Sequence, residues 1–286
     1  MSALRRRLTP YGLLGPGAIW LLLFFLVPLF YMGRLSLESG VVGNLQFTWN
    51  WANYGDALSL YNDQFVRSFG YAGSATALAL LLAYPLAYTI AFKAGRWRNV
   101  LLFAVIAPFF TTYLIRTLAW QTILADQSPV VDVLKLVGII PQDGRALATG
   151  PAVIAGLTYN FLPFMVLPIY ASLERIDVRL IEAANDLYAS TAQAFWRVTL
   201  PLSAPGVVAG TLLTFIPAVG DYVNAQFLGS AGNQMIGNVI QALYLRQADY
   251  PAAAALSFVL MALILVAVLV YIRFAGSEAL MGEEAR

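Results

Sequence analysis

The sequence predicts an all-α membrane protein with about six transmembrane helices, and two observations carry this prediction. Of the 286 residues, 60% are hydrophobic and only 11% are charged, whereas a soluble domain carries about 25% charged residues. Apolar stretches of roughly 20 residues, long enough to cross a bilayer, recur along the chain. We therefore expect a single transmembrane domain over residues 1–286.

The first apolar stretch, 12–33, follows the basic residues Arg5, Arg6 and Arg7. This order is typical of a signal peptide, but no small-residue cleavage site precedes Arg34, so we expect a retained signal anchor. The other stretches are expected to be helices because unpaired backbone groups are costly in lipid. These stretches are 68–92, 100–120, 151–172, 205–225 and 252–274. Internal prolines should kink several of them.

The distribution of positive charge predicts the orientation. If both termini are cytoplasmic, eleven Lys and Arg residues lie on the cytoplasmic side, five lie outside and Arg116 lies within the third span. Positive charge favours the cytoplasmic side, so both termini are predicted to be inside. The outer loop 35–67 then carries Trp49, Trp51 and Tyr54, which suit a membrane interface.

Several functional classes are excluded by composition. The sequence contains no Cys and no His, which removes the usual zinc and iron–sulfur ligands and any catalytic triad built on His. A net charge of only +2 gives no reason to expect nucleic acid as a partner. The sequence also lacks a GxxxxGK[ST] phosphate loop. We expect a non-catalytic chain with no metal and no cofactor of its own.

The predicted cytoplasmic loop at about 173–204 is too apolar to be a simple connector. Asp177 is a candidate N-cap for a helix over 178–188. Ser190 and Gln193 have capping-box spacing and should start a second short helix, which Leu200-Pro201 should end. The loop is thus predicted to be a helix–turn–helix at the cytoplasmic surface.

Two acids on the first of these helices suggest that it contacts a protein. Glu182 and Asp186 are four residues apart and share a face, beside the small Ala183 and Ala184. Such a helix can enter a groove that has a basic rim. An amphipathic helix on lipid headgroups is the alternative, but an acid pair is unfavourable against anionic lipid. Phe195 is expected, with its neighbour Val198, to pin the second helix to the loop.

These residues resemble the EAA loop of permease subunits in ABC importers, which would make this a type I ABC importer permease fold. In that family the loop docks into a groove on the cytoplasmic ATPase. The resemblance rests on the EAA triplet and the later Phe and Leu-Pro positions. Tyr188 is a departure, because the family usually has Gly there. The resemblance implies coupling roles for Glu182, Ala183, Ala184, Asp186, Tyr188, Ala189, Phe195, Leu200, Pro201 and Pro205.

Residues outside the loop narrow the resemblance. The stretches 108–120, 162–173, 220–223 and 236–241 are similar to permeases of the spermidine/putrescine type, and to the first member of the permease pair. That resemblance implies a bacterial inner membrane location and a second permease subunit. It also implies an extracytoplasmic solute-binding protein and two copies of an ATPase subunit, which would bind ATP and Mg²⁺.

Polar and aromatic residues at membrane depth are candidates for the solute path. Asp221 in the fifth span would suit a polycation by charge, and aromatic neighbours would add cation–π contact. Alternatively, Asp221 caps a helix end or contacts the second permease. Arg116 would repel a polyamine and is expected to snorkel or to pair with an acid. The path candidates are Asp221, Tyr222, Trp120, Tyr159 and Asn160.

The fifth span also carries small residues at every fourth position: Gly206, Gly210, Thr214 and Ala218. Such a stripe lets helices approach closely, and we expect a packing face within the permease pair. Two other functions stay open. A permease for ferric iron, a sulfate-like ion or another solute would share the loop. A stand-alone channel or secondary transporter fits the proline-broken helices, but no internal repeat supports it. A membrane scaffold without transport is a third class.

Overall fold

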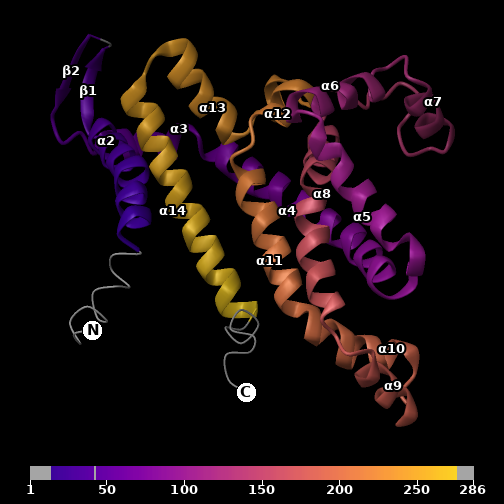
Figure 1. The fold of residues 1–286 in the computed structure, drawn as a ribbon. Coiled ribbons are helices and arrows are strands. Elements are labelled where there is room, and N and C mark those ends of the chain that lie inside the picture. The colour runs from indigo at the N-terminus through magenta and orange to yellow at the C-terminus, as the bar shows by residue number, and fades with distance from the viewer. Residues whose placement is uncertain (1–13, 42, 276–286) are drawn as a thin grey trace, which may run out of the picture. The chain divides into compact units, whose positions relative to one another are not determined.

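The computed structural model describes residues 14–41 and 43–275, and this part of the chain is almost entirely helical (Figure 1). Five helices are long and apolar enough to cross a membrane, and a sixth span is possible if one bent helix pair counts as one crossing. The prediction of about six spans is therefore confirmed. The five are Leu14–Leu35, Asn62–Lys93, Gly150–Glu174, Thr191–Val219 and Tyr250–Phe274.

The first span comprises η1 (Leu22–Leu26) and α2 (Val27–Leu35) after its opening turns. The later spans comprise α4 (Asn62–Tyr88) with η2 (Thr89–Lys93), α8 (Gly150–Glu174), α10 (Thr191–Ala194) with η5 (Phe195–Thr199) and α11 (Leu200–Val219), and α14 (Tyr250–Ala275). Arg5, Arg6, Arg7 and Arg286, which count toward the orientation, lie outside the described residues. The cytoplasmic placement of both termini stays a prediction.

Shorter elements connect these spans. The strands β1 (Glu38–Val41) and β2 (Asn44–Phe47) form an antiparallel hairpin in which Glu38 pairs with Phe47. The connecting helices are α3 (Ala52–Leu60), η3 (Gly95–Trp97), α5 (Arg98–Ile106), η4 (Ala107–Phe110), α6 (Tyr113–Ile123), α7 (Pro129–Leu136), α9 (Val178–Asp186), α12 (Val223–Leu228), η6 (Ala231–Asn233), α13 (Ile236–Ala242) and η7 (Leu243–Gln247).

The third predicted span, 100–120, is not one helix. The helical segment Gly95–Phe110 ends before Thr111, and α6 leaves at an angle of 96° to it. Thr111 and Thr112 both have extended backbone, with ψ near 140° and 147°. Threonine is β-branched and favours extended conformation over helix, so two consecutive threonines interrupt the apolar run. Trp120 therefore lies on a separate helix.

The predicted fifth span, 205–225, is displaced toward the N-terminus. One helix runs without interruption from Thr191 to Val219, so the prediction that Leu200-Pro201 ends the second loop helix is wrong. A π turn widens the helix at η5, directly before Pro201. Proline lacks an N–H and crowds the preceding turn, and a wider turn relieves that crowding. At the other end, the helix stops at Val219, and α12 begins two residues after Asp221.

The residue contacts divide the chain into two compact units. One unit comprises residues 1–62 with 239–261, and the other comprises 63–238 with 262–286. In the second unit, α4 and η2 pack against α8 around a buried core. This core contains Ala79, Ala83, Ala87, Ile90, Met165, Val166, Ile169, Tyr170, Leu173 and Ile176. The single transmembrane domain stays a prediction.

The small residues of α11 pack within this chain, against α8. A Cβ atom added to Gly206 would lie 2.5 Å from the carbonyl oxygen of Pro168, and one added to Gly210 would lie 3.0 Å from that of Met165. Thr214 and Ala218 are fully buried. The expected packing face within the permease pair is thus occupied by α8, because only glycine permits backbones to approach this closely.

Candidate functional site

The predicted coupling loop, residues 173–204, contains the two helices and the turn that the sequence predicts. Asp177 caps α9, since its carboxylate accepts the backbone N–H of Arg179 at 3.0 Å. Ser190 and Gln193 form a complete capping box that starts α10. The side chain of Ser190 accepts the N–H of Gln193, and the side-chain oxygen of Gln193 accepts the N–H of Ser190 at 2.9 Å. Local side-chain capping therefore sets both helix starts.

The turn between these helices has the geometry that glycine normally provides. Tyr188 adopts a left-handed backbone with φ of 64°. Its N–H donates to the carbonyl of Asn185 at 2.9 Å, and the N–H of Ala189 donates to that of Ala184 at 3.1 Å. These two bonds form a Schellman motif. Because the left-handed residue closes the helix, α9 ends at Asp186, two residues before the predicted end.

A substitution tests the left-handed turn directly. A non-glycine residue in this conformation is disfavoured by about 1–2 kcal/mol, and replacement by glycine also loosens the unfolded chain by about 0.4–1 kcal/mol. We expect Tyr188→Gly to leave the unfolding temperature unchanged or to raise it slightly, whereas Leu187→Gly, at a neighbour with φ of −84°, should lower it. A clear loss of thermal stability in Tyr188→Gly would contradict the turn geometry.

The acidic side chains of the first loop helix are exposed. Glu182, Ala183 and Asp186 are exposed on α9, while Ala184 is half-buried. At the turn, Leu187 and Tyr188 are 82% and 97% exposed. An exposed surface of acids, small residues and two large apolar side chains is suited to a protein partner.

Phe195 anchors the loop to the helix bundle. Its ring lies 5.6 Å from the ring of Tyr84 and 6.2 Å from that of Tyr88, both in edge-on contact. The sequence predicted that Phe195 contacts the loop itself, but these rings belong to α4. Farther along the same helix, Leu200, Pro201 and Pro205 lie in the first turns of α11. The loop is therefore joined to α4 through Phe195 and continues directly into α11.

A second set of contacts joins the start of α5 to the end of α8, near the loop. The guanidinium of Arg98, at the start of α5, donates through Nε to the hydroxyl of Tyr170 at 2.5 Å and forms an ion pair with Glu174. Both partners lie in the last turns of α8, just before α9. The base of the loop is thus joined to the broken third span.

A buried polar cluster lies within the second unit, where α6, α8 and α12 meet. We define this cluster as Tyr113, Thr117, Asn160, Asp221 and Asn224. One carboxylate oxygen of Asp221 accepts the hydroxyl of Tyr113 at 2.5 Å, and the other accepts the backbone N–H of Asn224 at 2.8 Å. Asn160 donates to the side-chain oxygen of Asn224 at 3.1 Å. Asp221 is only 8% exposed.

These contacts place the five path candidates in three different settings. Asp221 and Asn160 belong to the polar cluster, and the Asp221 carboxylate accepts a backbone N–H in the first turn of α12, in line with the alternative interpretation of a residue at a helix end. Trp120 and Tyr159 form a second pair, with ring centroids 5.5 Å apart. Tyr222 is 41% exposed, and its backbone carbonyl accepts the side-chain amide of Asn238. The five candidates therefore do not form one site in the structure.

Sequence reasoning missed Tyr113, Thr117 and Asn224. Asn224 stands three residues after Asp221, close enough in sequence for the carboxylate to accept its backbone N–H where α12 begins, so this part of the cluster was predictable from local sequence. Tyr113 and Thr117 lie on α6, directly after the 96° break, and carried no local signal because they are far from Asp221 in sequence. Gly156 was also missed. A Cβ there would lie 2.6 Å from the side-chain oxygen of Asn224, so glycine is what lets α12 approach α8.

Arg116 lies beside this cluster in an arrangement that the sequence did not predict. The residue is only 8% exposed, and its guanidinium lies over the rings of Phe109 and Tyr113 at 4.9 Å and 5.6 Å. Among the described residues, its Nε and Nη1 atoms have no hydrogen-bond partner. Within the described residues, the Arg116 side chain neither reaches an exposed position nor pairs with an acid. Cation–π contact stabilises the buried charge instead.

Removing the Asp221 carboxylate should destabilise the chain. The hydroxyl of Tyr113 and the N–H of Asn224 would lose a buried acceptor, at a cost of about 1–3 kcal/mol each. We expect Asp221→Ala to lower the thermal unfolding temperature of the purified chain by several degrees. Asp126→Ala is the control, because that carboxylate joins an exposed ion pair with Arg145. Equal unfolding temperatures for the two variants would contradict a structural role for Asp221.

Sequence comparison places these features in a known family. Residues 16–276 match the family described as "Binding-protein-dependent transport system inner membrane component". The chain is 38% identical over 256 residues to the spermidine/putrescine transport system permease protein PotB of Haemophilus influenzae, covering 89% of this chain and 90% of that one. PotB of Escherichia coli K12 is also 38% identical, with 93% of it covered.

Comparison with solved structures supports the same fold. A bacterial ABC transporter involved in the import of the acidic polysaccharide alginate matches with a TM-score of 0.69 at 21% identity, over 95% of this chain and 96% of that one. The MetNI methionine ABC transporter matches with a TM-score of 0.54 at 17% identity, over 78% of this chain and 95% of that one. At these identities the likeness shows the fold alone, which is that of type I ABC importer permeases. The chain belongs to the family of inner membrane components of binding-protein-dependent transport systems.

Proposed function

We propose that this chain is a transmembrane subunit of an ATP-driven importer of polyamines, spermidine or putrescine. The observation that carries the choice of solute is the 38% identity to PotB, which extends over 89% of the chain. The chain forms half of the translocation path, and a second permease subunit forms the other half. An extracytoplasmic binding protein delivers the solute, and the assembly resides in a bacterial inner membrane.

The exposed loop supports coupling to a separate ATPase. The sequence has no phosphate loop of its own, so ATP and Mg²⁺ are bound by two cytoplasmic ATPase subunits. Glu182 and Asp186 project from α9, and their charges would meet a basic groove rim on the ATPase. Phe195 transmits movement of the loop to α4 through its contacts with Tyr84 and Tyr88. ATP-driven closure would thereby shift the bundle between its inward-open and outward-open states.

The hydrogen bonds of the polar cluster support a structural role for Asp221, in place of direct contact with the solute. Asp221 already accepts hydrogen bonds from two residues, so its carboxylate stabilises the contact between α6 and α12. Trp120, Tyr159 and the half-exposed Tyr222 then remain the candidates for direct contact with a polycation, through the faces of their rings.

Uptake in cells tests the choice of solute. Labelled spermidine and putrescine uptake would be compared in cells that carry or lack this chain, with the partner subunits present in both. We expect uptake of at least one polyamine to be lost without the chain. Unchanged uptake of both would contradict the polyamine assignment, and a screen of other binding-protein ligands would then identify the solute.

A further inference from the structure

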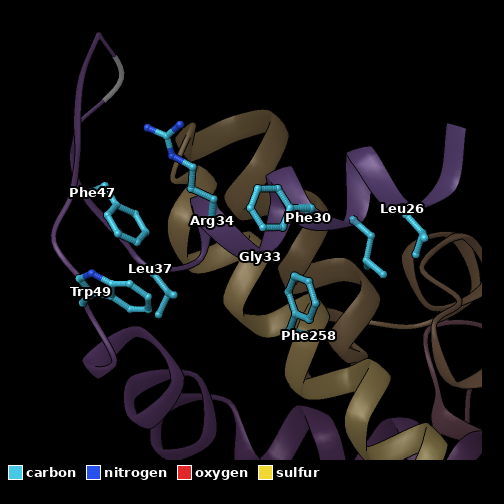
Figure 2. Close-up of a pocket in the computed structure, with 9 residues that line it drawn as sticks. Leu26, Phe30, Gly33, Arg34, Leu37, Phe47, Trp49 and Phe258 are labelled. Carbon is cyan, nitrogen blue, oxygen red and sulfur yellow. The ribbon is translucent and has the colours of Figure 1, made fainter. Parts of the chain in front are cut away.

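An apolar groove in the first unit differs from the loop and the polar cluster. Its cavity of about 790 Å³ is within the size range of small-molecule sites, and Figure 2 shows most of the side chains that form it. The lining residues are Leu26, Leu29, Phe30, Gly33, Arg34, Leu37, Phe47, Trp49 and Phe258. Arg34 is the single charged residue among them.

The groove has an apolar end and a polar end. Leu26, Phe30 and Arg34 succeed one another at four-residue intervals on the first span, so they share one helix face. At 1.5 Å per residue, Arg34 lies roughly 12 Å along the helix from Leu26. Arg34 is in the last turn of the span, whereas Leu26 lies toward the middle of its apolar stretch. A ligand that lies along the groove therefore needs a long apolar part and a polar end.

Arg34 is held in place, and within residues 14–41 and 43–275 its terminal nitrogens donate to no other group. Its Nε lies 3.2 Å from a carboxylate oxygen of Glu38, and its guanidinium lies 5.9 Å from the centre of the Phe47 ring. The side chain is still 56% exposed, whereas that of Glu38 is 12% exposed. The accessible group at this end of the groove is thus a cation. A planar guanidinium recognises phosphate well.

We propose that this groove binds a membrane phospholipid, with an acyl chain along Leu26, Phe30 and Phe258 and the phosphate on Arg34. Trp49 and Phe47 lie at the Arg34 end, where aromatic residues suit the level of the headgroups. A polyamine would be repelled by the exposed cation. An apolar helix of a partner subunit would bury this charge without adding an acceptor, which is unfavourable.

Lipid titration of the purified full-length chain, followed by native mass spectrometry, tests the phosphate contact. The probes are palmitoyl-oleoyl phosphatidylethanolamine and palmitoyl-oleoyl glycerol, which share their acyl chains but differ in the phosphate. We expect Arg34→Gln to weaken phosphatidylethanolamine binding about tenfold and to leave glycerolipid binding unchanged. Arg145→Gln is the matched control, because Arg145 is also exposed and paired with an acid. Equal affinity of the wild-type chain for both lipids would overturn the proposal.

A cross-linking experiment tests what occupies the groove. Because the sequence contains no cysteine, Phe30→Cys provides a unique attachment point for a photoreactive group. Illumination in native membranes should give an adduct with the mass of a phospholipid. An adduct with the mass of another protein chain would show that a subunit fills the groove, and it would overturn the proposal even if Arg34→Gln failed to fold.

Discussion

Glu182→Lys is expected to reduce solute uptake to the level of cells that lack the chain, while the chain remains in the membrane. Glu182 is exposed on α9, and the described residues give its side chain no hydrogen bond or ion pair that the substitution would break. The folded chain should tolerate the change. In the proposed complex, a lysine at this position would repel the basic rim of the ATPase groove. Reversing an interface charge costs several kcal/mol, or about tenfold in affinity per 1.4 kcal/mol.

Charge reversal at an exposed acid away from the loop provides the control. Asp132 is exposed on α7, a short helix like α9, and Asp132→Lys should leave uptake unchanged. Membrane fractions should contain both variants in equal amounts. In detergent, the Glu182→Lys chain should also fail to retain the ATPase subunit on purification. Wild-type uptake by Glu182→Lys would contradict the coupling role of the loop.

Gly206→Val is expected to cause a large loss of stability, because it forces two closely packed helices apart. Its Cβ would lie 2.5 Å from the backbone oxygen of Pro168 and 2.5 Å from the side-chain oxygen of Ser172. The backbone oxygen cannot rotate away, so α11 must move from α8. Overpacking of this kind costs about 1–3 kcal/mol, which corresponds to a fall of several degrees in the unfolding temperature.

Gly70→Val separates the steric effect from the helix propensity of valine. Gly70 lies in α4, and a Cβ there would meet nothing within 4 Å. Both variants place the same residue in a membrane helix, but only Gly206→Val should lower the unfolding temperature substantially. If the two variants unfold at the same temperature, the close contact between α8 and α11 is not a source of stability.

Features that depend on short-range chemistry were predictable from the sequence. Asp177 and Ser190 cap helices because their side chains bond to backbone N–H groups two and three residues away. The starts of both loop helices could therefore be predicted to the residue. The long spans were readable for a similar reason, since lipid requires a run of apolar residues to form a helix.

Features that depend on packing between distant segments were not predictable. The hydroxyl of Tyr113 reaches Asp221 across 108 residues of sequence, and the buried position of Arg116 depends on the break after Phe110. The apolar runs 100–120 and 205–225 were each predicted to be one helix. In the structure, helices end before Thr111 and Gly220, although the sequence stays apolar across both positions. At Pro201 the error was the reverse: a helix end was predicted, but the π turn before this proline lets the helix continue.

Transport in proteoliposomes tests most directly whether this chain works as a subunit of an ATP-driven importer. The chain would be reconstituted either alone or with the second permease, the ATPase and the binding protein, and accumulation of labelled spermidine and putrescine would be measured with and without ATP. We predict ATP-dependent accumulation by the full assembly and no flux through the chain alone. Polyamine flux through the chain alone, without ATP, would contradict it and would identify a stand-alone channel or secondary transporter.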